Sequence, residues 1–590
     1  MGLTSLLSVS KQGLFASQGN LQTISHNIAN VNTPGYSRQT ANLESTPGDL
    51  GNPIGNGVRI SEVTRQYDQL IQRREELGVA EVGRLETRDR FLGMIENVFN
   101  DLDGDGLSQR LESFYTSADN LADNPTNTVG REELVVKADS LARYFDDMDE
   151  SLSEVALPID QEISLVLDDI NVRLTALRDI NSTIVANDNT HPALDLKDQR
   201  RQMVLELGQI IDIRTFELPG DGLQIVTSQG QELLVDTVYA AEFKRSADVD
   251  VNGFMGIEVG GREFGINGKI AGGNLKGLLE IRDEVLYGTD GYITRLESIA
   301  DEVRFQVNKI HSQSVNQNLY TAQTGIIELG GNLDTAISSL ITDSSDTNYN
   351  NAPVDLSRVV PGTITFASGV DEDNLTTVST VNITTNMTLR EIKDAINNSG
   401  AVNASIISEG DEQFLEIEAP SGRLFGVASD TSNVLAALGV GGIFSGTGSN
   451  DMAVSADLMA DSKLLGIGQL NVDDSTDPVT VTFDDGHSGG ALALGALRNS
   501  KFTIDGDTTT ITGHYARLVG ELGSLVRQDK ESLIAQTSAQ NFISDLQESI
   551  SGVSLEEELT DLIRFQRAFQ ASSKMVGVAD ELMQTIISMV

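Results

Sequence analysis

Apolar residues recur at alternating intervals of three and four over the first thirty residues. Serines occupy positions 10 and 17 of this stripe, and its apolar members are Leu3, Leu7, Leu14, Leu21, Ile24, Ile28 and Val31. Such alternation is the heptad repeat of a coiled coil. At 1.5 Å per residue the helix would be about 40 Å long. We therefore expect a second long helix beside it.

A second stripe of the same kind closes the chain. Ser554 and Glu557 match a capping box, and the stripe continues through Leu555, Leu559, Leu562, Phe569, Val576, Ala579, Met583, Ile586 and Val590. Pattern alone leaves open that each helix packs on a globular core, which is the commoner arrangement. Terminal residues fray unless something covers them. We expect the two helices to cover each other in part, and to order fully when neighbouring copies supply the missing faces.

Between the ends the hydrophobic period changes several times. Helical spacing, interrupted at Asn124-Pro125, gives way to alternating runs with Gly-rich turns, then to one more helix and a long stretch rich in Gly, Asp, Ser and Thr. This order predicts an α+β multidomain fold with long terminal coiled-coil helices, a helical bundle arm and β-rich outer domains. The expected parts are an N-terminal helix and turn (1–65), a helical bundle arm (66–215), a small β-rich domain (216–286), a long helix returning to the bundle (287–324), a β-rich exposed insertion (325–511) and C-terminal helices (512–590).

Composition excludes several classes of protein. The chain of 590 residues has 41 basic and 87 acidic side chains, and its formal charge of -46 disfavours binding to nucleic acid or an anionic membrane. Cysteine is absent, which excludes disulfides, Cys-based zinc sites and thiol nucleophiles. We find neither an apolar run long enough to span a membrane nor a cleavable signal, so any export is expected to use another route.

The N-terminal stripe ends in HNIANVNTPGYSRQ, residues 26 to 39. Because the residue before a proline avoids the helical region and Pro-Gly suits a type II turn, the helix should stop and the chain should turn at Pro34-Gly35. Taken together, the heptad helix and NIANVNTPGY resemble the N-terminal motif of the bacterial flagellar axial proteins, the rod, hook and hook-associated family.

Three further blocks strengthen this resemblance. The continuation SRQ, the block GGNLKGLLEIRDEVL at 272–286 and the C-terminal string LTDLIRFQRAFQASSKMVGVADELMQTI are similar to the hook-filament junction members of the family. Residues 387–406 resemble the hook IN module found in several flagellar proteins. The chain departs from the family pattern after His311, where related junction proteins carry a glycine and a D-L-x-G turn.

The resemblance implies a non-enzymatic structural subunit, secreted through the flagellar type III apparatus, that forms a ring between hook and filament outside the cell. Its terminal helices would line the axial tube, and the turn would pass the chain outward. Implied partners are further copies, the hook protein, a second junction protein with the filament, and a cytosolic export chaperone on the C-terminal helix; no cofactor, nucleic acid or membrane insertion is implied. The expected assembly residues are Leu3, Leu7, Leu14, Leu21, Ile24, Asn27, Ile28, Asn30, Asn32, Thr33, Pro34, Gly35, Tyr36, Leu562, Phe565, Phe569, Val576, Leu582 and Ile586.

Charge fits this interpretation, since the first forty residues contain no Asp or Glu. Carboxylates repeated in a dry tube of packed copies would repel one another. Two other classes stay open. A hook or distal-rod subunit would share the terminal motifs, although SRQ, RFQRAFQ and the long arm favour the junction. A surface adhesin or glycan hydrolase could be carried on residues 325–500, where Asp and Glu are the only abundant catalytic residue types.

One motif suggests metal chemistry. Asp101, Asp103, Asp105, Gly106 and Glu112 match the spacing of an EF-hand calcium loop. No second loop is present, and Ser108 replaces a usually apolar position. Both a structural calcium ion and a solvated acidic turn with a helix cap therefore stay open. The five histidines, His26, His191, His311, His487 and His514, lack ligand spacing, and we expect them to be dispersed over the surface without a metal or catalytic role.

Overall fold

The computed structural model describes residues 3–47, 55–99, 106–187, 193–228, 232–263, 270–316, 318–329, 333–342, 356–410, 412–473, 475 and 479–589. The chain divides into two compact units. Unit 1 comprises Met1–Phe91, Pro158–Ile281 and Arg527–Val590, and unit 2 comprises Leu92–Leu157 and Arg282–Val526. Each unit therefore joins segments that are far apart in the sequence, and the α+β multidomain class expected from the sequence is confirmed.

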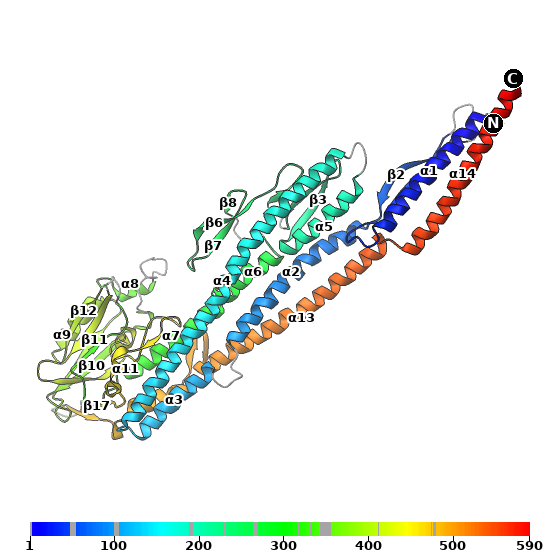
Figure 1. The fold of residues 1–590 in the computed structure, drawn as a ribbon. Helices are drawn as coiled ribbons and strands as arrows, with labels where there is room; N and C mark the ends of the chain where they lie inside the picture. The colour runs from blue at the N-terminus through cyan, green and yellow to red at the C-terminus, as the bar shows by residue number, and fades with distance from the viewer. Residues whose placement is uncertain are drawn as a thin grey trace. The chain divides into compact units, whose positions relative to one another are not determined.

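Long helices dominate unit 1. Both predicted terminal helices are present, as α1 (Leu3–Ala29) and α14 (Leu555–Met589), and Figure 1 shows them side by side with the two chain ends together. The other helices that contribute to unit 1 are α2 (Gln69–Val98), α4 (Thr128–Asn187), α5 (Leu194–Ile210), α6 (Asn274–Leu279) and α13 (Ile511–Ser551).

The strands of unit 1 form three small antiparallel groups. A hairpin of β1 (Gln39–Thr46) and β2 (Gly57–Arg65) follows the N-terminal turn and packs on α1; the sequence did not predict it. The region expected to be β-rich holds two three-stranded sheets, which are β3 (Ile213–Leu218), β4 (Gly222–Thr227) and β5 (Leu233–Val235), and β6 (Phe243–Val249), β7 (Met255–Val259) and β8 (Arg262–Glu263).

Unit 2 begins with helices from the arm. Helix α3 (Leu107–Asp123) ends just before Asn124-Pro125, where the sequence predicts a break, and α4 starts at Thr128. A π-helix (Glu280–Leu286) then leads into α7 (Tyr292–His311). The helix expected over 287–324 is thus shorter, because Val315 pairs with Gly468 (N to O, 2.8 Å) and β9 (Ala322–Thr324) joins β13 (Glu412–Glu418).

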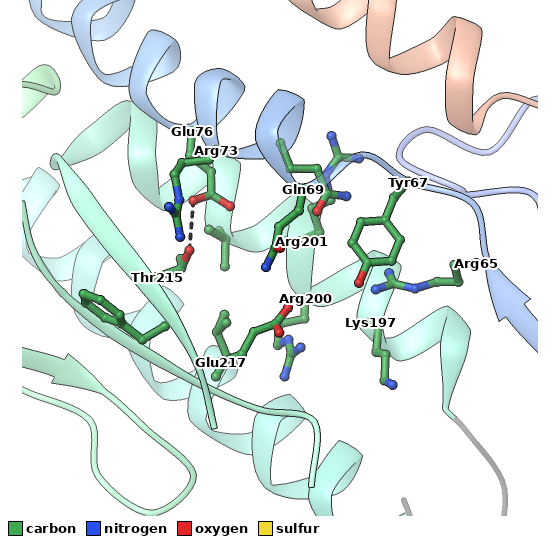
Figure 2. Close-up of a pocket in the computed structure, with 14 residues that line it drawn as sticks. Arg65, Tyr67, Gln69, Arg73, Glu76, Lys197, Arg200, Arg201, Thr215 and Glu217 are labelled. Atoms are coloured by element: carbon green, nitrogen blue, oxygen red, sulfur yellow. Dashed lines mark hydrogen bonds between the residues drawn. The ribbon is translucent and has the colours of Figure 1, made fainter. Parts of the chain in front are cut away.

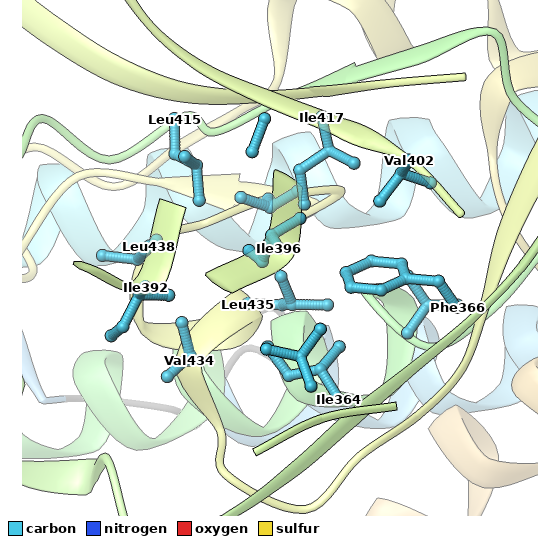
Figure 3. Packing of buried hydrophobic residues seen from close by; sticks show 14 of the residues in the cluster. Ile364, Phe366, Ile392, Ile396, Val402, Leu415, Ile417, Val434, Leu435 and Leu438 are labelled. Carbon is cyan, nitrogen blue, oxygen red and sulfur yellow. The ribbon is translucent and has the colours of Figure 1, made fainter. Parts of the chain in front are cut away.

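Described residues between 315 and 470 build an apolar core. Two three-stranded sheets, β11-β10-β14 and β12-β13-β9, surround it with α9, and Figure 3 shows side chains such as Phe366, Ile396 and Leu415 within it. The segment that resembles the hook IN module, 387–406, contributes α9, whose Thr388 and Glu391 form a capping box. The elements are β10 (Gly362–Gly369), β11 (Thr377–Ile383), α9 (Leu389–Ser399), β12 (Asn403–Glu409), β13 (Glu412–Glu418) and β14 (Leu424–Asp430).

Shorter elements complete unit 2. Helices and 3-10 turns are α8 (Ile337–Thr342), Leu356–Arg358, α10 (Val434–Ala437), α11 (Ala456–Ala460), Ser462–Leu464, Asp485–His487, α12 (Gly489–Ala496) and Leu497–Asn499. Strands are β15 (Phe444–Ser445), β16 (Ala453–Val454), β17 (Leu470–Asp473), β18 (Thr480–Phe483), β19 (Phe502–Ile504) and β20 (Asp507–Thr509). Helix α12 packs on α3.

The described helices include none with the length and hydropathy that a membrane crossing requires. Over the same residues no group of three or more His, Asp or Glu side chains is arranged to hold a metal ion. Asp101, Asp103 and Asp105 lie outside the described residues, so the calcium motif stays a prediction. Glu112 is described, and its carboxylate accepts a hydrogen bond from Arg498 at 2.9 Å.

The surface position expected for the histidines is wrong for His311 and His514, which are 3% and 0% exposed; His191 lies outside the described residues. His311 Nε2 accepts a hydrogen bond from the Gly466 amide at 2.8 Å, and Nδ1 therefore donates to the Gly441 carbonyl. Complete burial lowers the pKa of His311 to about 4, and the nearby positive charge of Arg131 lowers it a little further. The hydrogen bond to Gly441 acts in the opposite direction and raises the pKa.

Acid should therefore destabilise unit 2 through His311. Since the pKa falls from 6.5 to about 4 on folding, the unfolded chain binds more protons between these values, and stability is lost as the pH falls through this window. The shift in pKa corresponds to a loss of about 3 kcal/mol of stability at the lower end of this pH window. Urea unfolding of unit 2 at pH 7 and pH 4.5 should show a smaller acid effect in His311→Gln than in the natural chain. The exposed His487→Asn is the control, and an equal acid effect in all three proteins would contradict the prediction.

Candidate assembly site at the terminal helices

Helices α1 and α14 pack antiparallel along their length. A Cβ placed on Gly13 would lie 3.1 Å from Ser572 Oγ, and further along, Asn27 Nδ2 donates to Glu558 Oε2 at 3.1 Å. Residue numbers thus rise along α1 while they fall along α14. The absence of a side chain at Gly13 allows the two helices to approach closely there.

The buried surface of α1, which packs on both α14 and the β1-β2 hairpin, consists mainly of small and polar residues. Ser10, Ala16, Ser17, Asn20, Ile24 and Asn27 are buried, and together with Gly13 we call them the terminal seam. Its polar groups are satisfied locally, because Ser10, Ser17 and Asn20 each donate 2.8 Å hydrogen bonds to carbonyls one turn earlier in α1. Burying them therefore leaves no unpaired donor.

The predicted leucine stripe lies at the edges of this seam. Ile24 is buried, but Leu7, Leu14, Leu21 and Ile28 are only half-buried; the side chain of Leu3 lies outside the described residues. In α14 the predicted Leu562, Phe565, Phe569 and Val576 are half-buried, whereas Leu582 and Ile586 are 45% and 49% exposed. Within one chain, small residues decide where the helices meet, because they permit the shorter distance.

Much of the apolar surface of α14 is exposed to solvent. Eight of its large apolar residues are between 44% and 73% exposed: Leu555, Leu559, Ile563, Met575, Val578, Leu582, Ile586 and Ile587. We call this set the outer face. Met575 also borders α1, in a pocket with Ser10 and Gly13. Exposed large apolar side chains in this number mark an interaction site.

The predicted turn after α1 is confirmed. The Tyr36 amide donates to the Thr33 carbonyl at 3.2 Å, and Gly35 has a φ of 74°, as a type II turn requires at its third position. Thr33 Oγ1 donates to Asn30 Oδ1 at 3.2 Å. Asn32, Thr33 and Pro34 are exposed, so the tip of the turn is free for contact with another molecule.

Asn27 ties this turn to both neighbouring segments. Its Oδ1 accepts from the Gln39 amide at 3.0 Å and from the Tyr36 hydroxyl at 2.8 Å, while Nδ2 donates to the Gln39 carbonyl at 2.9 Å and to Glu558. Burial, reinforced by nearby carboxylates, raises the pKa of Tyr36. The phenol therefore stays a neutral donor at every physiological pH.

Two ion pairs beside Asn27 were not predicted from the sequence. Arg38 Nε donates to Glu558 Oε1 at 2.7 Å, and the Glu558 side chain is only 2% exposed. Asp198 accepts from the Ser37 amide and hydroxyl at 3.1 and 2.8 Å and from Arg65 at 2.7 Å. A signal for Glu558 was available, since it lies in phase with Leu555, Leu562 and Phe565 on the heptad stripe of α14.

Three parts of the chain match models of flagellar protein families. Residues 92–325 match the family model described as the flagellar hook-associated protein FlgK helical domain. Residues 7–36 match the flagella basal body rod protein model, and 548–589 match the flagellar basal body rod FlgEFG protein C-terminal model. The last two matches coincide with α1 and its turn and with α14.

Full-length relatives agree with these matches. Proteins named flagellar hook-associated protein 1 from Salmonella typhimurium, Escherichia coli K12 and Bacillus subtilis are each 25% identical over 99% of this chain, and are covered over 100%, 100% and 97% of their own lengths. The structure of the flagellar hook junction protein FlgK from Burkholderia pseudomallei has a similar fold, with a TM-score of 0.52 at 16% identity over 81% of this chain and 100% of that one. The chain therefore belongs to the flagellar hook-associated protein 1 family.

Proposed function

We propose that this chain is a structural subunit of the bacterial flagellum, exported by the flagellar apparatus, and that copies form the junction ring between hook and filament through their terminal helices. The names and full-length match of the relatives support the junction assignment. The hook protein, a second junction protein with the filament, and an export chaperone on the C-terminal helix are the partners proposed with it. No catalytic activity is part of this function.

One observation carries the assembly mechanism. The terminal seam joins α1 to α14 through small and polar residues, and the outer face leaves large apolar side chains in contact with water. Exposure of apolar surface costs roughly 25 cal/mol per Å². Side-by-side packing of copies would bury the outer face and the half-buried leucines of α1 together. Because α1 contains no acidic residue, repeating it around a ring adds no negative charge.

Hydrogen exchange tests this mechanism directly. The purified chain would be compared with the chain assembled on isolated hook tips. We expect peptides from 555–589 and 3–29 to become protected at least about tenfold on assembly, since apolar packing suppresses local opening. Peptides from the core around β10 and α9, which is complete within one chain, serve as the internal control.

Two results would count against the proposal. If the chain does not bind hook tips, the junction function is wrong. If it binds while the terminal peptides keep their exchange rates, the junction can stand but assembly does not use the terminal helices.

A further inference from the structure

A small cavity in unit 1 gathers most of the local positive charge. It has a volume of about 210 Å³ and lies where the start of α2, helix α5 and strands β3 and β4 meet (Figure 2). Five cationic side chains line it, together with two carboxylates, Glu76 and Glu217; the cations are Arg65, Arg73, Lys197, Arg200 and Arg201. In a chain with a formal charge of -46, such a concentration of positive charge requires an explanation.

Three of these cations are already neutralised. Arg65 pairs with Asp198 at 2.7 Å, Lys197 with Asp221, and Arg201 with Glu75. Asp198 also accepts the hydrogen bonds of Ser37. These pairs hold the walls of the cavity in place and leave their carboxylates engaged.

The remaining donors make no ion pair with a carboxylate within the described residues, although Glu76 interacts electrostatically with Arg73 and Glu217 with Arg200. Arg200 donates to Asn181 Oδ1 at 2.8 Å and to the Asp221 carbonyl at 2.7 Å, and it makes no ion pair within the described residues. Arg73 is exposed and has no hydrogen-bond or ion-pair partner in that part of the chain. Gln72 Nε2 also lines the cavity, and it is buried without an acceptor. Buried donors of this kind normally have partners.

Electrostatics supports the same interpretation. Burial, with the positive charge of Arg65, lowers the pKa of Arg200 to about 10 despite Asp221 and Glu217 nearby. The positive charge at this position is therefore incompletely compensated. An acceptor that brings negative charge would satisfy Arg73, Arg200 and Gln72 at once.

Size and lining indicate a protein segment as the occupant. The cavity is smaller than the roughly 300 Å³ at which small-molecule pockets begin, and it suits one or two side chains. Tyr67 and Phe216 line it and are 42% and 49% exposed. Aromatic residues combined with arginine are enriched in protein-protein interfaces.

The complementary surface lies on the hairpin of β6 and β7. Its tip exposes Val249 (58%), Val251 (97%) and Met255 (44%). Asp248 is exposed and its carboxylate has no partner within the described residues, whereas Asp250 accepts from the Asn252 and Phe254 amides at 2.9 Å and so shapes the turn. The tip is acidic and apolar where the cavity is basic and aromatic.

We propose that the β6-β7 tip of one copy docks into the Arg73-Arg200 cavity of a second copy. The Asp248 carboxylate supplies the missing acceptor, and the exposed valines pack on Tyr67 and Phe216. Because the tip and the cavity are different surfaces, the contact is head-to-tail, the type that closes a ring. The inference rests on the proposed function, since the terminal helices must hold copies side by side.

Charge reversal tests the contact on hook tips. Arg73→Glu and Asp248→Arg should each lower the amount of chain bound about tenfold, and combining them in one chain should restore most of it, because the pair is re-formed with opposite signs. Neither residue makes a hydrogen bond or ion pair within the described residues, and Arg73 interacts with Glu76 only electrostatically, so folding is expected to be unchanged. Arg74→Glu, an exposed neighbour that does not line the cavity, is the matched control.

Cross-linking adds a readout that does not depend on affinity. Since the chain has no cysteine, Gln69→Cys at the cavity and Val251→Cys at the tip introduce single thiols. Mixed copies assembled on hook tips should form disulfide-linked dimers, and neither variant alone should. Phosphate at millimolar concentration should not reduce this yield if a carboxylate segment is the occupant.

The outcomes separate the two proposals. If the natural chain assembles, while charge reversals have no effect and mixed thiols do not cross-link, the docking contact is wrong and the junction function stands. Cross-links in Val251→Cys copies alone would replace it by a tip-to-tip contact. Failure of the natural chain to bind hook tips would remove the proposed function and this inference with it.

Discussion

Glu558→Ala should detach the C-terminal helix from the turn that follows α1. The carboxylate is buried and binds both Arg38 and Asn27. Its removal leaves the half-buried guanidinium with only the exposed Glu557, and the Asn27 amide with only the Gln39 carbonyl. Loss of one partner of a buried ion pair costs about 3 to 5 kcal/mol. Hydrogen exchange of peptides from 555–589, together with their rate of proteolysis, should rise strongly in the isolated chain.

Glu557→Ala is the matched control. Its carboxylate also accepts from Arg38, at 2.8 Å, but the side chain is 64% exposed, and an exposed pair contributes at most about 1 kcal/mol. Combining Glu558→Ala with Arg38→Ala should recover part of the loss, because the unpaired cation is removed as well. Equal effects of Glu557→Ala and Glu558→Ala would show that the buried network does not hold α14.

Substitution of the outer face should abolish assembly while leaving the isolated chain intact. Leu559 and Ile563 are 50% and 51% exposed, so Leu559→Glu with Ile563→Glu should change the stability of the monomer by about 0.5 kcal/mol per site or less. In the assembled tube the same side chains would be buried. We expect binding to hook tips to fall about a hundredfold, because each lost apolar contact is worth about 1.5 to 3 kcal/mol.

The control adds the same negative charge at polar positions of the same helix. Thr560→Glu with Gln566→Glu changes two exposed residues and should reduce binding far less. Comparable losses in both double variants would mean that charge on α14, rather than its apolar surface, governs assembly. Normal binding of the Leu559 and Ile563 variant would exclude the outer face from the interface.

Local patterns predicted the elements well where the signal is contained in neighbouring residues. Heptad spacing predicted α1 and α14, and Thr33-Pro34-Gly35-Tyr36 predicted its type II turn, because the conformations of proline and glycine restrict the backbone locally. The motifs around that turn also indicated the family. The β1-β2 hairpin was not predicted, since its strands are largely polar and are stabilised by packing on α1.

Contacts between distant residues were beyond prediction from the sequence. Arg38 and Glu558 are separated by most of the chain, and nothing in either local pattern names the other as its partner. The burial of His311 depends on the Gly441 and Gly466 backbones, which only the folded insertion brings to its ring.

The heptad stripes illustrate what the sequence determines and what only the tertiary structure decides. The sequence by itself determined that both chain ends are amphipathic helices, that α1 carries no acidic residue, and that no disulfide contributes to the fold. Only the tertiary structure decided which row of α1 meets α14. Ser10 and Ser17, the polar members of the predicted stripe, are buried together with Gly13, where the absence of a side chain permits close approach to Ser572 of α14. The leucines are thereby left at the edge.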